Sequence, residues 1–326
     1  MFVPTPQTPI GSGFGAASTA AEVVAGRDLR DKTVVVTGGY SGIGVETVRA
    51  LRSAGAKVIV PARDMAKAKT NLAEMPDVEL APLDLLDPTS IDAFGKWFLT
   101  RSGTLHILVN NAGIMAPPLA RDSRGYESQF SANHLGHFQL TCVLWPALVR
   151  AEGARVIALS SYGHRRAGVD FHDPNFERRE YDPWIAYGQS KTANSLFAVA
   201  LDSIGQRQNV RAFAVHPGGI VTDLLRHMPK AQIEAYHIID DAGKPIIDPE
   251  NNKKTPQQGA ATTVWCATSP RLEGMGGVYC ADCDIARALP SDDSTEMHGV
   301  RPRAIDPVAA GRLWQLSERL TGATLD

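Results

Sequence analysis

The chain has 326 residues, of which 44% are hydrophobic and 21% are charged. This composition is close to the globular average, which excludes a disordered, collagen-like or coiled-coil protein and leaves one large domain or two smaller ones. The 33 Lys and Arg residues nearly balance the 35 Asp and Glu residues, for a net charge of −2, so no excess of positive charge favours binding to nucleic acid or to an anionic membrane.

Residues 1–26 are predicted to form an N-terminal arm followed by a short helix. Thr19 and Glu22 have the spacing of a capping box at a helix start, and Gly26 is placed to end the helix. No basic residue precedes Arg27 and no long apolar run follows, so we expect neither a secretory signal nor a membrane span, and a cytoplasmic location.

The four cysteines are too few for a disulfide scaffold in a chain of this length. Cys280 and Cys283 have the spacing of half a zinc site, but no second pair or histidine cluster supplies the other ligands. The sequence therefore predicts reduced thiols and no metal, as suits a reducing compartment.

Short apolar runs alternate with helical segments over most of the chain. Because parallel strands need crossover connections, this alternation predicts an α/β fold, a doubly wound parallel sheet of about seven strands in a single domain over residues 27–286. The predicted strands are residues 33–37, 57–60, 78–81, 106–109, 155–159, 210–215 and 277–280.

Two segments depart from this alternation. Residues 219–258 hold four prolines, an Asp240-Asp241 pair and a polar Asn-Asn-Lys-Lys run, and they follow the end of a strand, where open sheets bind ligands. We expect a substrate lid there, and a tolerated surface insertion is the alternative. The tail, residues 287–326, is predicted to contain a helix that docks through Val308, Leu313, Leu316 and Leu320.

A glycine-rich turn joins the first strand to the first helix. Residues 37–44 read Thr-Gly-Gly-Tyr-Ser-Gly-Ile-Gly, and glycines at this position let a backbone approach the pyrophosphate of a dinucleotide at a helix N-terminus. A plain tight turn would look similar, since the spacing differs from the common G-x-G-x-x-G fingerprint.

The end of the second strand predicts the choice of cofactor. Enzymes that prefer NAD place a carboxylate there, whereas this chain has Ala62 followed by Arg63. A guanidinium can pair with the 2′-phosphate of NADP, so the sequence favours NADP(H) over NAD(H). An ordinary solvated Arg63 would leave the choice open.

Tyr187 and Lys191 are four residues apart in a predicted helix, so both side chains can address one ligand. A nearby ammonium can lower the pKa of a phenol from about 10, which would make Tyr187 a usable proton donor or acceptor. The alternative is an ordinary pair on the helix surface. Three further polar segments follow strand ends on the same side of the sheet: residues 110–113, residues 160–161 and residues 217–222.

Taken in chain order, these motifs resemble those of the short-chain dehydrogenases/reductases, over about residues 19–286. The resemblance within the family is to the retinol-dehydrogenase-like and WW-domain-oxidoreductase-like branch, which also has a long gap between Ser161 and Tyr187. It implies NAD(P)-linked interconversion of an alcohol and a ketone or aldehyde.

The resemblance also implies roles for individual residues. Ser161 resembles the serine that binds the substrate oxygen, Tyr187 the general acid/base, Lys191 its cofactor-binding partner, and Asn133 the asparagine that anchors a water in the proton relay. Together with Tyr187 and Lys191, the residues implied to bind the cofactor are Gly38, Tyr40, Ser41, Ile43, Arg63, Asp84, Leu85, Asn111, Ala112, Gly113, Pro217, Gly218, Ile220 and Thr222.

The substrate is expected to be a small and largely apolar molecule, and the chain could form a homo-oligomer. Apolar candidates for the pocket are Phe171, Trp184, Leu224, Leu225, Met228 and Tyr236, which could equally form the core of the lid. His164, Arg165, Arg166 and His172 could line the entrance of the pocket or lie on the surface. The alternative to an enzyme is a redox sensor that binds NADP without turnover.

Overall fold

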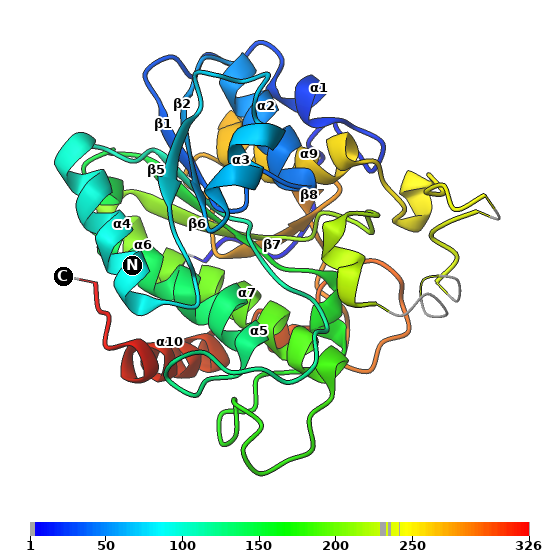
Figure 1. Ribbon diagram of the computed structural model, residues 1–326. Coiled ribbons are helices and arrows are strands. Elements are labelled where there is room, and N and C mark those ends of the chain that lie inside the picture. The colour runs from blue at the N-terminus through cyan, green and yellow to red at the C-terminus, as the bar shows by residue number, and fades with distance from the viewer. Residues whose placement is uncertain (1–3, 229–232, 234–235, 241, 326) are drawn as a thin grey trace.

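The computed structural model describes residues 4–228, 233, 236–240 and 242–325 and contains one eight-stranded sheet in the order β3-β2-β1-β4-β5-β6-β7-β8 (Figure 1). Strands β1 to β7 pair in parallel, and β8 pairs antiparallel with β7. The predicted doubly wound sheet is confirmed, with one short strand beyond the expected seven. The strands are β1 (Thr33–Val36), β2 (Lys57–Ala62), β3 (Glu79–Pro82), β4 (Ile107–Asn110), β5 (Ala154–Leu159), β6 (Val210–Val215), β7 (Val278–Ala281) and β8 (Asp284–Ile285).

The central strands are buried on both faces, as their continuous apolar runs predict. In β1, Val35 belongs to one hydrophobic cluster while Val34 and Val36 belong to the other, because successive side chains in a strand point to opposite faces. The sheet therefore separates two cores.

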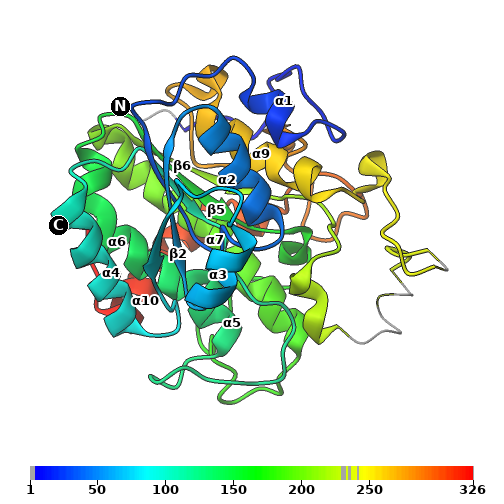
Figure 2. The same cartoon turned by 45° about the horizontal axis from the view of Figure 1, so that its top comes forward.

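Helices cover both faces of this sheet. One layer consists of α1 (Ala20–Val24), α2 (Ile43–Ser53) and α9 (Pro256–Thr268), and the opposite layer of α4 (Pro88–Arg101), α6 (Gly136–Val149) and α7 (Pro183–Gly205) (Figure 2). Two further helices are short: α3 (Met65–Asn71) follows β2, and α5 (Ser128–Phe130) precedes α6. The layer with α7 is the one that brings Tyr187 to the sheet.

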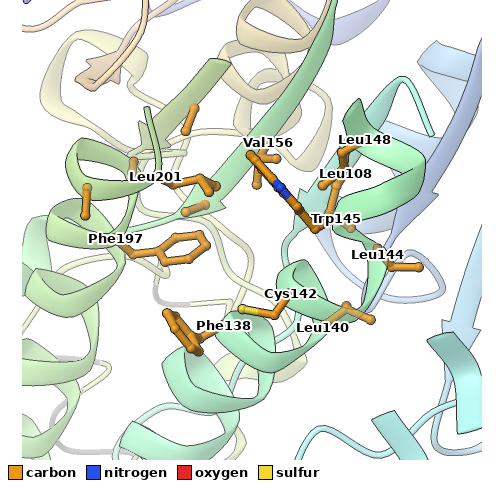
Figure 3. Packing of buried hydrophobic residues seen from close by; sticks show 14 of the residues in the cluster. Leu108, Phe138, Leu140, Cys142, Leu144, Trp145, Leu148, Val156, Phe197 and Leu201 are labelled. Carbon is orange, nitrogen blue, oxygen red and sulfur yellow. The ribbon is translucent and has the colours of Figure 1, made fainter. Parts of the chain in front are cut away.

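The core beneath α6 and α7 is built largely of aromatic and long aliphatic side chains. Phe138 and Trp145 of α6 point toward the space shared with Phe197 of α7 and Val156 of β5 (Figure 3). All four are at least 97% buried, so this packing fixes α7 against the sheet.

The N-terminal arm is tied to the far edge of the sheet. The predicted capping box of Thr19 and Glu22 is present at α1. In the preceding arm, the side chain of Gln7 bonds to the backbone of Tyr279, and the Asp284 carboxylate accepts hydrogen bonds from the backbone N–H groups of residues 10–12. The arm thus lies along β7 and β8.

The tail ends in the predicted docking helix, α10 (Pro307–Thr321). Its contacts with α7 include the Trp314 ring, which stacks on Phe197 with centroids 6.1 Å apart, and Leu313 and Leu316 are buried. The expectation for Val308 is wrong, because this side chain, in the first turn of the helix, is 72% exposed. In the described part of the chain no helix is long and apolar enough to cross a membrane.

In the described part of the expected lid, residues 219–258, regular structure is limited to short elements. It contains short 3-10 helices at Asp223–His227 and Pro249–Asn251, and its last residues belong to α9. Its return segment is anchored where Gly219 bridges Lys253. Residues 229–232, 234–235 and Asp241, which fall within the expected lid, lie outside the described residues.

Candidate active site

The carboxyl ends of the central strands open into a cleft of about 770 Å³. Among the residues assigned catalytic or cofactor-binding roles from the sequence, only Asn133 does not line it, because its side chain is fully buried. The cleft is lined by Gly38, Tyr40, Ser41, Ile43, Arg63, Asp84, Leu85, Asn111, Ala112, Gly113, Ser161, Tyr187, Lys191, Pro217, Gly218, Ile220 and Thr222.

The turn between β1 and α2 depends on glycine. Gly38 has φ +63°, and a Cβ atom there would lie 3.0 Å from Cα of Ala112. The neighbouring segment after β4 is fixed by Asn111, whose side-chain amide donates to the Thr37 carbonyl at 2.8 Å and whose backbone N–H donates to the Thr37 hydroxyl at 2.9 Å. The backbone of the two segments thereby forms the floor of the cleft at the N-terminus of α2.

Arg63 lies at the end of β2, on the wall of the same cleft. Its side chain is exposed and forms no hydrogen bond or ion pair with the residues that the structure describes. The carboxylate of the next residue, Asp64, accepts a hydrogen bond from the N–H of Lys67 and caps α3. The Arg63 guanidinium therefore lines the cleft without a described protein partner.

An ion pair joins the two walls near Arg63. Lys67 Nζ of α3 lies 2.8 Å from the Asp223 carboxylate, which directly follows Thr222. The pair raises the pKa of Lys67 and lowers the pKa of Asp223. Both groups are substantially exposed, so the contact orders the rim more than it stabilises the fold.

Tyr187 lies at the other end of the cleft, in the second turn of α7. Its side chain is only 5% exposed. Burial raises the pKa of Tyr187 to about 12, and a hydrogen bond with Ser161 acts in the opposite direction. The Ser161 hydroxyl also accepts from the N–H of Gly163 at 3.0 Å, so its position is fixed next to the phenol.

Lys191 lies one helical turn beyond Tyr187, as the spacing predicts. Its Nζ donates to the carbonyl of Leu159 at 2.9 Å and lies 5.6 Å from the centre of the Tyr187 ring. Burial lowers the pKa of Lys191 to about 8. The expected lowering of the Tyr187 pKa by Lys191 is not found, because desolvation of the phenol outweighs other effects.

Asn133 lies in a five-residue π-helix, Ser131–Leu135, between α5 and α6. Its amide oxygen accepts from the N–H of Ile114 at 2.9 Å, and its amide nitrogen donates to the Ile114 carbonyl and the Ser190 hydroxyl, each at 3.0 Å. These bonds connect the segment after β4 to α7. π-Helical turns of this kind occur frequently at functional sites.

Apolar side chains surround the phenol on its open side. Met115 and Ala116 cluster with Tyr187, and Trp184 packs its ring edge-on at 6.3 Å between centroids. The other lining side chains at this end that the sequence singled out are Leu224, Leu225, Met228 and Tyr236.

Three expectations about the long gap before Tyr187 are corrected. Phe171 does not line the cleft; the Arg312 guanidinium of α10 covers its ring at 4.2 Å. His164 is fully buried, with its imidazole bonded to the Ser161 carbonyl and the Arg301 N–H. Of the four entrance candidates, only Arg166 lines the cleft.

One group of residues beside the cleft was missed from the sequence: Tyr162 and Asn252 line the cleft, and the buried His216 connects them. The Tyr162 ring stacks on His216 with centroids 3.7 Å apart, and His216 Nε2 lies 2.8 Å from the side-chain oxygen of Asn252. Tyr162 directly follows Ser161, so this group connects the catalytic candidates to the return segment of the lid. The sequence offered one indication of this group: His216 directly precedes Pro217, which was already assigned to the cofactor site.

No metal site accompanies the cleft in the residues that the structure describes, where no group of three or more His, Cys, Asp or Glu side chains could hold an ion. All four cysteines are buried.

A parallel sheet with a glycine turn at its first helix and a ligand cleft at its carboxyl edge defines a Rossmann-type, nucleotide-binding fold. The model of the "short chain dehydrogenase" family matches residues 32–233, more than half of the chain. The chain therefore belongs to the short-chain dehydrogenase/reductase family of NAD(P)-dependent oxidoreductases.

Relatives in this family agree with the resemblance read from the motifs. The chain is 43% identical over 298 residues to a protein of Streptomyces lividans named "Probable oxidoreductase", covering 88% of this chain and 97% of that protein. It is 37% identical to human retinol dehydrogenase 12, covering 90% and 87%. It is 36% identical to the human WW domain-containing oxidoreductase, covering 94% and 72%.

Solved structures show the same fold. A crystal structure of an uncharacterized protein from Mycobacterium paratuberculosis matches with a TM-score of 0.72 and 32% identity, covering 95% of this chain and 99% of that one. The complex of Pseudomonas aeruginosa RhlG with NADP matches with a TM-score of 0.60 and 24% identity, covering 78% and 95%.

Proposed function

We propose that this oxidoreductase uses NADP(H) in preference to NAD(H) and interconverts an alcohol and its ketone or aldehyde on an apolar small molecule. The observation that carries the proposal is the placement of the Ser161 hydroxyl and the Tyr187 ring side by side, both next to Gly163 and both lining the cleft. A serine hydroxyl and a phenol side by side can both bind one carbonyl oxygen.

The roles of the two hydroxyls follow from their chemistry. Bound nicotinamide would supply a hydride to the carbonyl carbon or remove one from the alcohol carbon. Because its pKa is raised, Tyr187 holds its proton at neutral pH and can donate it to the carbonyl oxygen during reduction. Ser161 donates a hydrogen bond to that oxygen, so the negative charge that develops there is stabilised.

Lys191 and Asn133 are proposed to support this pair. The Lys191 ammonium stands behind the phenol, and its positive charge favours the phenolate that forms when Tyr187 gives up its proton. Asn133 holds Ile114 and Ser190 and thereby keeps the segment after β4 against α7.

The cofactor proposal is supported by the fit of the cleft to a dinucleotide. The turn at Gly38 leaves no room for a side chain against Ala112, so backbone N–H groups at the start of α2 face the cleft, where a pyrophosphate would bind. At the end of β2, the unpaired guanidinium of Arg63 can hold a 2′-phosphate, and Ala62 leaves out the carboxylate that would favour NAD. The proposed cofactor-binding residues are those named from the sequence.

A single assay series tests this proposal. Consumption of NADPH is followed by nicotinamide absorbance with a panel of apolar aldehydes and ketones, for the wild type and for Arg63→Asp. We expect turnover, and a loss of NADPH preference over NADH of at least about tenfold in the variant. Lys69→Asp, an exposed charge on α3 that does not line the cleft, is the matched control.

Two results would count against the proposal. An unchanged cofactor preference in Arg63→Asp would remove Arg63 as the reader of the 2′-phosphate. NADPH binding without consumption across the panel would instead support the redox-sensor alternative.

A further inference from the structure

Arg166 brings a positive charge to the apolar part of the cleft. Arg166 lines the cleft, and its guanidinium lies 5.0 Å from the centre of the Trp184 ring. Its Nη2 donates to the Tyr236 hydroxyl at 2.7 Å. The Trp184 ring in turn lies 6.3 Å from the Tyr187 ring, so a short apolar path connects the guanidinium to the phenol.

This positive charge has no counterion in the described part of the chain, where no carboxylate pairs with Arg166. The described carboxylates that line the cleft are already engaged elsewhere: Asp64 caps α3, Asp84 accepts from the Leu86 N–H, and Asp223 pairs with Lys67. A lone guanidinium beside a mostly apolar pocket is an anion-binding group without its anion.

Tyr236 adds a second donor to the same place. Because its oxygen accepts a hydrogen bond from Arg166, the phenolic proton remains available to donate. The Tyr236 ring packs edge-on against Trp184, with centroids 6.3 Å apart, so the hydroxyl is held beside the guanidinium. A guanidinium and a hydroxyl at this distance can bind the two oxygens of one carboxylate.

We propose that Arg166 and Tyr236 bind a carboxylate of the substrate, and that the substrate class is an oxo or hydroxy carboxylic acid. The oxygen that reacts would bind at Ser161 and Tyr187, the carboxylate at Arg166, and an apolar chain would lie between them against Trp184 and Met115. The inference rests on the proposed function and narrows it: the substrate of that same site would be apolar along its chain and carry one carboxylate at its end.

The test uses matched acids and esters with the NADPH-saturated protein. Straight-chain oxo carboxylic acids of increasing length are each compared with their methyl ester, which has the same carbonyl but no charge. The readouts are kcat/KM and, independently of turnover, the dissociation constant by calorimetry. The variants are Arg166→Gln and Arg178→Gln, an exposed arginine in the same insertion that does not line the cleft.

We expect the wild type to prefer at least one acid over its ester by about tenfold or more, in kcat/KM and in affinity. Arg166→Gln should reduce this preference by about the same factor, through KM more than kcat, while Arg178→Gln keeps it. Equal use of acids and esters by the wild type, or an unchanged preference in Arg166→Gln, would overturn the inference. If no compound turns over, the proposed function fails, and the calorimetric preference alone still decides whether Arg166 binds a carboxylate.

Discussion

Gly163 and Tyr187 are in such close contact that only glycine fits at position 163. A Cβ atom built on Gly163 would lie 2.6 Å from Cε1 and 2.8 Å from Cδ1 of the Tyr187 ring. The N–H of Gly163 also donates to the Ser161 hydroxyl. One glycine thus fixes the distance between the two hydroxyls that are proposed to bind the reacting oxygen.

Gly163→Ala should therefore lower kcat by roughly ten- to a hundredfold, because the new methyl group has to displace the phenol. The fold should survive, since the contact is with one side chain. Steady-state kinetics and a thermal melt check the two parts. Gly168→Ala is the control, because its Cβ atom would meet only Arg303 at 3.4 Å, an ordinary contact. Equal kcat in both variants would contradict the account.

The lowered pKa of Lys191 predicts a pH dependence of stability. The folded protein releases this proton near pH 8, whereas the unfolded chain keeps it up to about pH 10.5. Between these values the unfolded state binds more protons, so the contribution of Lys191 to the free energy of unfolding rises with pH.

From pH 7 to pH 9.5 this contribution should rise by about 2 kcal/mol. Urea unfolding of the wild type and of Lys191→Met at both pH values measures it as the change in their difference. Lys69→Met, an exposed lysine on α3, should show no such change. A difference between wild type and Lys191→Met that is independent of pH would show that Lys191 is not desolvated in the folded protein.

Helix α10 offers a stability test with a control in the same helix. Trp314 is 8% exposed and packs against Phe138 and Phe197, so Trp314→Ala should lower the free energy of unfolding by about 3 kcal/mol. Val308 is 72% exposed, and Val308→Ala should change the free energy by less than about 0.5 kcal/mol. Denaturant titrations that gave similar losses for both would contradict the packing described.

The parts of the fold that the sequence predicted correctly are those with strong local patterns. The run Thr33–Val36 has three consecutive valines after one threonine, a pattern that favours a strand buried on both faces, and the motifs at strand ends then fall on one edge of the sheet. The location of the cleft could be predicted from these motifs, because open parallel sheets bind ligands at the carboxyl ends of their strands. Strand β8 was missed because it has two residues and depends on left-handed backbone at Asp282 and Cys283.

The errors concern side chains whose environment is made by distant segments. Phe171 looks like a pocket residue in sequence, and only the docking of α10 places it against Arg312. The Tyr187 pKa was expected to fall because Lys191 is nearby, but the burial that raises it depends on how the segments around α7 pack. The sequence did not distinguish Arg166 from His164, Arg165 and His172; the fold does, because Arg166 alone of these four lines the cleft.

The most direct test of the account is the Tyr187→Phe variant, measured for both NADPH binding and turnover. The change removes one hydroxyl and keeps the ring that packs against Trp184 and Met115. We predict NADPH affinity close to that of the wild type and a loss of kcat of at least about a hundredfold, because no proton can be transferred to the substrate oxygen. Turnover at the wild-type rate would contradict the assignment of Tyr187 and, with it, the proposed reaction.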